Sequence, residues 1–284
     1  MAHRIDRIQG HVMPVNSYIL YGPDGVVVVD SMLTVADATS VRDAVRASGR
    51  TMAGVVVTHP HPDHYAGLGY VVRDDDVPII ATRAVDAIIR RDDDVKNAIV
   101  GPMMGAEWPT TRPFPNQLVD DGDQVDIGGI TLTAEELGPG ESHVDTLWWL
   151  DAETVFAGDV VYNGMHAYLA DGRWGEWLET LQRLEARLAD DVTLYIGHGS
   201  PGGKELLAAQ RRYIEMFVAV VDEHAEALAN GADHAPVVSA MKTLVPNDDL
   251  LFLMDLSIDP VLAARRGAAH ETHGAAGSAS LSPP

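Results

Sequence analysis

The stretch Thr58-His59-Pro60-His61-Pro62-Asp63-His64 decides the fold, because it places a run of potential metal ligands directly after a buried strand. The preceding Val55-Val56-Val57 is too short and too β-branched to be a helix. Each proline restricts the residue before it to an extended backbone, so His59 and His61 are both expected to be extended. Alternate residues of an extended chain point the same way, and the two imidazoles should therefore converge on one point.

Other potential ligands lie at the ends of further predicted elements. A helix is predicted to begin at His64, and its dipole favours the ionised form of Asp63. Glycine beside a strand end lets the backbone pack closely around an ion. The candidates in such positions are His143, before the strand that begins at Thr146, Asp159, after the strand Val155–Ala157, and His198, after the strand that ends at Ile196.

Strands and helices alternate in two series along the chain. This order predicts an α/β fold of two halves, whose sheets pack face to face with helices outside. We expect a main domain over residues 1–232, a helical extension over residues 233–262, and a disordered tail over the Ala-, Gly-, Ser- and Pro-rich residues 263–284. Residues 92–117 are expected to form a long irregular stretch, whose Met103, Met104, Trp108 and Phe114 argue against disorder.

The composition limits the partners and the ligand chemistry. The chain has 284 residues, 46% of them hydrophobic, and a formal net charge of −22. A surface this acidic repels phosphate backbones and anionic lipid, so we expect no nucleic acid and no membrane partner. Without cysteine, a metal must be held by nitrogen and oxygen. The N-terminus lacks the apolar core of a secretory signal, and a cytoplasmic location is expected.

These motifs resemble those of the metallo-β-lactamase-fold hydrolases. The resemblance covers roughly residues 10–230 and includes His59-Pro60-His61-Pro62-Asp63-His64, His143, Gly158-Asp159 and Gly197-His198-Gly199, in that order. It implies a four-layer αβ/βα sandwich with the site at one edge of the two sheets. It also implies that His59, His61 and His143 bind one metal ion, that Asp63, His64 and His198 bind a second, and that Asp159 bridges them.

The turn before His143 departs from the family pattern. In many members the corresponding histidine directly follows Pro-Gly, whereas here Glu141 and Ser142 stand between Pro139-Gly140 and His143. The resemblance therefore leaves open whether His143 or Glu141 completes the first metal site.

Two divalent cations held by two aspartates and neutral histidines would leave the site at a charge of +2. A water between the ions should then lose a proton near neutral pH, which predicts a hydrolase with a metal-bridging hydroxide as its nucleophile. Asp63 is expected to orient this group and to take up its proton. Zinc is the first choice from the ligand types, and iron or manganese fits the same set.

The substrate is expected to be a small molecule with an ester or amide bond, most simply a lactone or β-lactam-like ring. No signal is visible for a β-lactamase acting outside the cytoplasm, so a lactone is preferred. Residues 103–114 are expected to form an apolar wall of the pocket, which favours uncharged acyl groups. The candidate substrate-binding residues are His11, Met13, Tyr65, Trp108 and His166.

Other functions stay open at this point. One is a glutathione thioesterase similar to glyoxalase II, with Arg211 and Arg212 as candidates to hold the glutathione carboxylates. Another is an oxygenase with a single iron, similar to persulfide dioxygenases. A third is a non-catalytic binding protein, which predicts missing ligands. The sequence also leaves a homodimer open.

Overall fold

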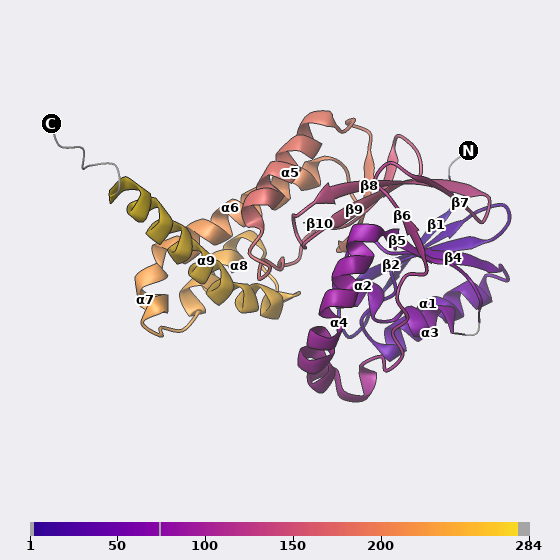
Figure 1. The fold of residues 1–284 in the computed structure, drawn as a ribbon, viewed down its shortest axis with the longest axis horizontal. Helices are drawn as coiled ribbons and strands as arrows, with labels where there is room; N and C mark the ends of the chain where they lie inside the picture. The colour runs from indigo at the N-terminus through magenta and orange to yellow at the C-terminus, as the bar shows by residue number, and fades with distance from the viewer. Residues whose placement is uncertain (1–2, 74, 278–284) are drawn as a thin grey trace.

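Two β-sheets that face each other form the centre of the molecule (Figure 1). The computed structural model describes residues 3–73 and 75–277, with the backbone alone for residues 267–277. The first sheet contains, in spatial order, β1 (Ile5–Gln9), β2 (Asn16–Tyr21), β3 (Val26–Val29), β4 (Met52–Val56), β5 (Ile79–Thr82) and β6 (Gln117–Val119). The second contains β11 (Thr193–His198), β10 (Thr154–Tyr162), β9 (Asp145–Trp149), β8 (Ile130–Gly138) and β7 (Gln124–Ile127).

The alternation of side chains along the strands separates two apolar cores. In β3, Val27 and Val29 belong to the core between the sheets, whereas Val26 and Val28 belong to the core beneath the helices. Successive side chains of a strand point to opposite faces, so a run of valines supplies both cores at once. Trp148 and Phe156 fill the inner core from the second sheet.

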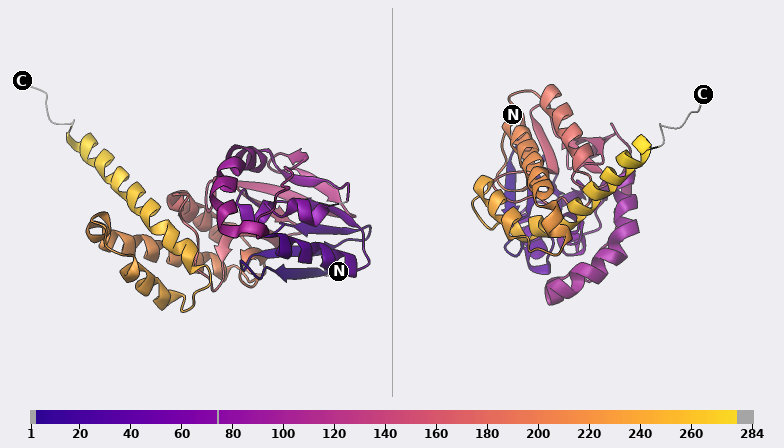
Figure 2. Two further views of the ribbon diagram at one scale, coloured as in Figure 1. Left: turned by 90° about the horizontal axis from the view of Figure 1, so that it is seen from below. Right: turned by 90° about the vertical axis from the view of Figure 1, so that its left-hand side faces the viewer.

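Helices cover the outer faces of both sheets, as the views in Figure 2 show. On the side of the first sheet are α1 (Val35–Ala47), α2 (Pro62–Tyr65), α3 (Leu68–Val72) and α4 (Arg83–Met104). Helix α5 (Trp174–Arg187) lies between β10 and β11 in the chain. After β11 come α6 (Glu205–Glu223), α7 (Ala225–Ala229), α8 (Ala235–Leu244) and α9 (Leu251–Gly277). The result is the predicted four-layer αβ/βα sandwich.

The prediction of an irregular stretch over residues 92–117 is wrong for its first half. Helix α4 continues through the acidic run Asp92-Asp93-Asp94 to Met104. Asp93 is buried, and Arg112 holds it with two hydrogen bonds of 2.9 Å each. This ion pair neutralises the charge that the helix would otherwise bury, because paired charges are the ones that proteins bury.

Several element boundaries also differ from the predictions. β10 continues to Tyr162, so Asp159 lies within the strand and not after it. The helical residues 205–229 are divided into α6 and α7, which meet at His224. β1 and β6 were not predicted, and both are edge strands of the first sheet.

The C-terminal helices pack on α6 and share its core. Val237, Met241, Met254 and Ile258 are buried in the same cluster as the core of the main domain. Helix α9 runs to Gly277, so the tail predicted to be disordered from residue 263 is helical as far as the structure describes it; residues 278–284 lie outside the described residues. The division at residues 232 and 262 stays a prediction.

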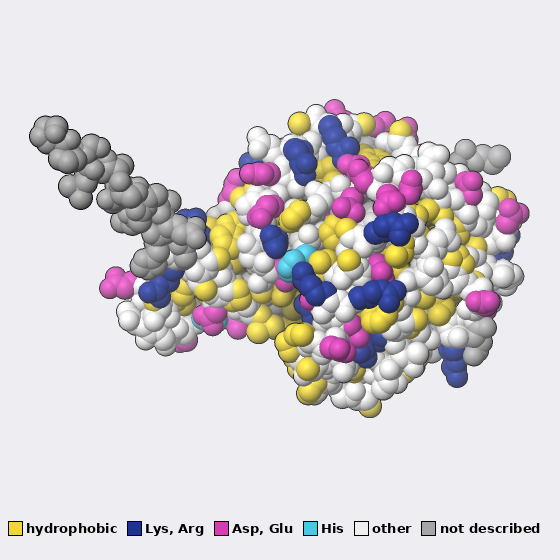
Figure 3. Space-filling model, in the orientation of Figure 1, with side chains coloured by type: hydrophobic (Ala, Val, Ile, Leu, Met, Phe, Trp, Pro, Cys, Tyr) yellow, Lys and Arg dark blue, Asp and Glu magenta, His cyan; other side chains and the backbone are white. Residues whose placement is uncertain are grey.

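Side chains of both charge signs lie on the surface (Figure 3), although the sequence has 42 acidic and only 20 basic residues. Acidic and basic side chains alternate on the face shown in Figure 3, which has no continuous basic patch. Among the described helices, none combines the length and the apolar character that crossing a bilayer requires.

Candidate metal centre

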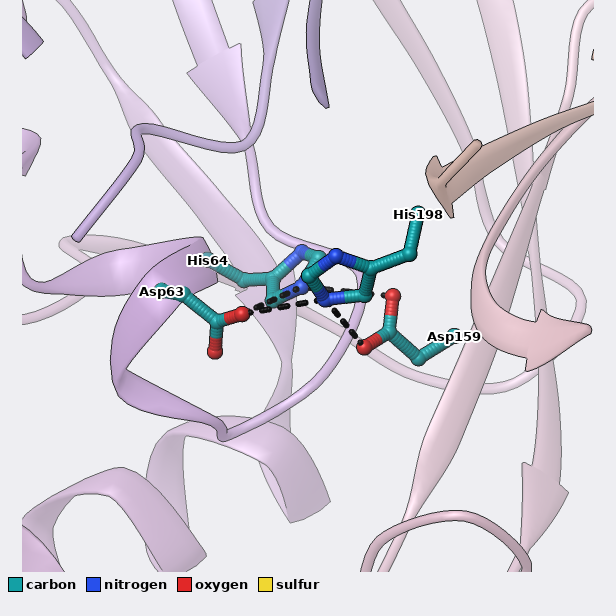
Figure 4. Close-up of side chains that lie close together, drawn as sticks. All are labelled: Asp63, His64, Asp159 and His198. Atoms are coloured by element: carbon teal, nitrogen blue, oxygen red, sulfur yellow. Dashed lines mark hydrogen bonds and ion pairs between the residues drawn. The ribbon is translucent and has the colours of Figure 1, made fainter. Parts of the chain in front are cut away.

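Two groups of metal-binding side chains lie side by side at one edge of the two sheets. The Asp159 cluster consists of Asp63, His64, Asp159 and His198 (Figure 4). The Glu141 cluster consists of His59, His61 and Glu141. Within each cluster the potential ligand atoms all lie within 4.8 Å of one another. The loop after β4 and the helix α2 supply the residues of the predicted motif, and β10 and β11 supply Asp159 and His198.

The Asp159 cluster has the spacing of ligands around one ion. His198 Nε2 lies 3.1 Å from Asp63 Oδ2 and 3.1 Å from Asp159 Oδ2. His64 Nε2 lies 3.3 Å from Asp159 Oδ1. Two ligands of a tetrahedral zinc ion are roughly 3.4 Å apart when each lies about 2.1 Å from the ion. The four side chains therefore fit a zinc-sized cation.

The Glu141 cluster is adjacent to the Asp159 cluster, and Asp159 is the residue that lies between them. Glu141 Oε2 lies 2.9 Å from His61 Nδ1 and 3.6 Å from His59 Nε2. Asp159 Oδ2 lies 3.9 Å from His59 Nε2. The hydroxyl of Tyr162 contacts both clusters, at 3.0 Å from Glu141 Oε1 and 2.9 Å from Asp159 Oδ2. Asp159 is thus placed to face two ions.

Buried polar atoms without hydrogen bonds mark the same place. Among the described side chains, His59 Nε2, His64 Nε2, Glu141 Oε2 and Asp159 Oδ1 are buried and make no hydrogen bond of acceptable geometry. Such groups are rare in folded proteins, because each costs about 1–3 kcal/mol when it loses water without gaining a partner. Their convergence on one point fits cations as the missing partners.

The second nitrogen of each histidine ring is held from outside the clusters. Such contacts fix the orientation and the tautomer of a histidine that binds a metal. The pairs are His59 Nδ1 with Thr58 Oγ1 at 3.0 Å, His61 Nε2 with Asp171 Oδ2 at 3.2 Å, His64 Nδ1 with Asp30 Oδ2 at 2.8 Å, and His198 Nδ1 with Pro14 O at 2.9 Å.

Two glycines make room for this packing. A Cβ atom on Gly197 would lie 1.9 Å from Asp159 Oδ1 and 2.7 Å from His64 Cε1. A Cβ atom on Gly158, whose φ is +51°, would lie 2.7 Å from Thr58 Oγ1. Any larger residue at either position would push the ligand side chains apart. The glycines beside Asp159 and His198 are therefore part of the site's construction.

Without metal ions, the pKa values of the clustered side chains differ from their ordinary values. Burial alone would lower the pKa of His198, but Asp159 and Asp63 raise that pKa to about 10. Burial raises the pKa of Glu141 to about 8, against the pull of His61. The pKa of Asp63 stays well below its usual range, since His64 and His198 outweigh its burial. Without metal ions, protonated histidines thus supply the positive charge that balances these carboxylates.

Asp30 holds two residues of the site, Thr58 and His64, by hydrogen bonds. Its Oδ1 accepts from the Thr58 backbone N–H at 2.9 Å, and its Oδ2 contacts both Thr58 Oγ1 and His64 Nδ1 at 2.8 Å. We expect Asp30→Asn to weaken zinc binding about 10- to 100-fold, because the amide NH2 would face His64 Nδ1 and favour the wrong tautomer. Asparagine tolerates the φ of +59° at this position, so the backbone should be unaffected.

Competition with a chromophoric chelator would measure this effect. Asp126→Asn, at an exposed position in β7, is the matched control and should bind zinc like the unmodified protein. Equal zinc affinities for Asp30→Asn and Asp126→Asn would show that Asp30 does not contribute to metal binding.

His143, which the resemblance assigns to the first metal site, does not lie in either cluster, whereas Glu141 does. His143 contacts Asp171 Oδ2 at 3.2 Å with its side chain partly exposed. The hydrogen bonds of the turn explain why Glu141, and not His143, lies in the cluster. Asp145 accepts from the Glu141 backbone N–H at 2.9 Å and from Ser142 Oγ at 2.8 Å, which directs Glu141 inward and leaves His143 on the outside.

One pocket of about 220 Å³ opens onto the clusters. Of the candidate substrate-binding residues, Met13 lines this pocket, whereas His11, Tyr65, Trp108 and His166 do not. The last four have other contacts: the His11 backbone with Asp37, Tyr65 with Asp93, Trp108 with Asn97, and His166 with Tyr213. The predicted apolar wall is present in part, since Met103 and Met104 line the pocket.

Three residues at the site were not predicted, and a fourth, Glu141, was left open as the alternative to His143. Glu141 had a visible signal, since it directly follows Pro139-Gly140 where the family places its ligand. Tyr162 was hidden because β10 was expected to end at Ala157. Asp30 and Asp171 act over long separations in the chain, and no local pattern points to them.

Comparisons with known proteins agree with this geometry. The family model described as "Metallo-beta-lactamase superfamily" matches residues 11–198. Hydroxyacylglutathione hydrolases from Bdellovibrio bacteriovorus and Aeromonas salmonicida are 26% and 27% identical over 163 and 165 residues. Each match covers 57% of this chain and 55% or 54% of the relative, so the chain spans about half the length of these relatives.

Solved structures with the same fold extend over nearly the whole chain. A beta-lactamase domain protein from Burkholderia ambifaria superimposes with a TM-score of 0.69 at 19% identity, covering 95% of this chain and 88% of that one. A metallo-beta-lactamase family protein from Thermus thermophilus gives 0.65 at 18% identity, covering 93% and 94%. At these identities the likeness concerns the fold.

Proposed function

The chain belongs to the metallo-beta-lactamase superfamily, and we propose that it is a metal-dependent hydrolase that opens an ester or amide bond in a small substrate. The observation that carries the proposal is the pair of adjacent clusters, with Asp159 near both, that line an apolar pocket. Our assignment gives one ion to His59, His61 and Glu141 and the other to Asp63, His64 and His198, with Asp159 facing both. Zinc suits this nitrogen and oxygen set.

Two divalent ions held there would acidify a water molecule and polarise a carbonyl oxygen. Asp63 lines the pocket and stays ionised, so it is our candidate for the group that accepts the proton of the attacking water. Tyr162 also lines the pocket, and its hydroxyl holds Glu141 and Asp159 in their relative orientation. Burial of both clusters limits competing access by bulk water.

The pocket favours an uncharged acyl group over a charged one. Its wall beyond the clusters is apolar, and Lys96 is the one lysine or arginine among the described residues that line it. A neutral ester or lactone needs no further charge partner there, because apolar surface supplies most of the binding of such ligands. A lactone or a related ring is therefore our preferred substrate.

A hydroxyacylglutathione is the second candidate, because the curated relatives carry the name hydroxyacylglutathione hydrolase. Glutathione has two carboxylates, which call for cationic partners. Arg211 lies outside the pocket and pairs with Glu185 and Glu215, each at 3.4 Å, and Arg212 is exposed on the same helix. The geometry therefore gives this candidate one cation, Lys96.

An oxygenase with a single iron is a weaker candidate. His59, His61 and Glu141 would match the two-histidine, one-carboxylate set of such enzymes. However, the Asp159 cluster is complete as well, which favours two ions. Metal content and oxygen consumption distinguish the two cases.

A substrate panel tests the proposal directly. We expect the zinc-loaded protein to hydrolyse γ-lactones and simple esters faster than β-lactams, S-lactoylglutathione or a phosphodiester. Dialysis against a chelator should abolish turnover, and zinc should restore it. Turnover that survives complete removal of metal would refute the proposal, and faster hydrolysis of S-lactoylglutathione would select the second candidate.

A further inference from the structure

We propose that the substrate carries an unbranched aliphatic chain, which lies in an apolar groove between α4 and α9. This α4–α9 groove is lined by Ile99, Val100, Met103, Phe252, Leu253 and Leu256. The inference rests on the proposed function, because it concerns the same pocket and names the class of ester or lactone that the pocket binds.

The residues of α4 that face the groove form one stripe of the helix. Lys96, Ile99, Val100, Met103 and Met104 recur at the spacing that places side chains on a single helical face. Lys96 begins this stripe, and the rest of it is apolar. A long face of aliphatic side chains matches an aliphatic ligand, because it presents no hydrogen-bonding groups that a polar ligand would need.

Large apolar side chains are unusually exposed at the groove. The structure describes seven such exposed residues, and four of them, Ile99, Met103, Phe252 and Leu256, line this pocket. They are between 46% and 60% exposed. Figure 3 shows hydrophobic side chains gathered where α4 and the C-terminal helices meet. Exposed apolar surface that gathers in one place marks a binding site more often than scattered residues do.

The groove is continuous with the metal centre. The same pocket is lined at its inner end by His61, Asp63, Glu141, Asp159 and His198. A substrate whose reacting carbonyl lies beside the clusters can extend along the apolar part of the same pocket. The occupant is therefore the tail of the substrate itself, and an apolar tail gains the most from this path.

Part of the outer wall comes from the C-terminal segment, beyond the residues that the family model matches. The family model matches residues 11–198, whereas α9 begins at Leu251. The metal clusters thus come from the matched region, and part of the groove comes from beyond it. Substrate selection by α9 is consistent with this division, because elements around a shared catalytic centre commonly set specificity.

A chain-length series tests the inference. For γ-lactones with side chains from one to nine carbons, we expect kcat/KM to rise about fourfold with each methylene until the groove is filled. That factor corresponds to about 0.8 kcal/mol for each buried methylene. A flat series with ready hydrolysis of the short lactones would overturn the inference and leave the proposed function standing.

Two variants and a matched control locate the effect. Ile99→Ser and Leu256→Ser should each flatten the dependence of kcat/KM on chain length, because each removes apolar surface from the groove. Val95→Ser is the control, because Val95 is 58% exposed on the same helix as Ile99, at 59%, and does not line the pocket. A control that loses the dependence as strongly as Ile99→Ser would also overturn the inference.

Methionine methyl NMR tests the groove without turnover. Titration with 1-decanol should shift the signals of Met103 and Met104, which line the pocket, and leave that of Met216 on α6 unchanged. If no ester, amide, thioester or lactone is hydrolysed, the proposed function fails, and these shifts still decide whether the groove binds an aliphatic chain. Unshifted Met103 and Met104 signals would overturn the inference.

Discussion

Replacing Asp159 by alanine should abolish turnover and reduce the metal content below two ions per chain. Asp159 faces both clusters, with Oδ2 at 3.1 Å from His198 and 3.9 Å from His59. Residues that merely support a metal ligand already cost 10- to 100-fold when they are replaced. The loss of a carboxylate shared by two ions should therefore lower kcat/KM by more than about 100-fold.

The experiment separates loss of metal from loss of fold. Circular dichroism of Asp159→Ala should match that of the unmodified protein, because the surrounding core of β10 is apolar and remains packed. Asp159→Asn keeps the shape and the contact with Tyr162 but removes the charge, so it should show the same metal loss. A folded Asp159→Ala protein with two zinc ions and ordinary turnover would contradict the assignment.

The first motif was predictable because its geometry is local. The prolines at positions 60 and 62 control the backbone of His59 and His61, and the structure brings both imidazoles to Glu141. Asp159 and His198 were predictable as strand-end residues beside glycine, although β10 runs past Asp159. The two facing sheets likewise follow from apolar runs that serve cores on both faces.

The features that were missed depend on specific side-chain contacts. The helix over residues 92–104 buries Asp93, which Arg112 neutralises from nineteen positions away. The backbone N–H of Glu141 donates a hydrogen bond to Asp145, which directs Glu141 inward. Neither contact leaves a periodic pattern in the sequence, so local propensity did not predict the helix over residues 92–104.

The choice between Glu141 and His143 gives the second large effect. We expect Glu141→Ala to lower the zinc content from about two ions to about one per chain, because it removes one of three ligands from a cluster. kcat/KM should fall more than about 100-fold, as for Asp159→Ala. His143→Ala should keep both ions, since His143 is partly exposed and contacts Asp171 instead. Elemental analysis of the two purified variants measures the difference.

The opposite result, with the ion lost from His143→Ala and kept by Glu141→Ala, would restore His143 as the ligand. Glu141→His tests the same position by raising the net positive charge of the site. With Glu141, three carboxylates face two divalent ions and leave a charge of +1, whereas histidine at this position would leave +2. We therefore expect Glu141→His to retain both ions and to be inhibited more strongly by a carboxylate product, because the attraction between the site and an anion grows with the site's positive charge.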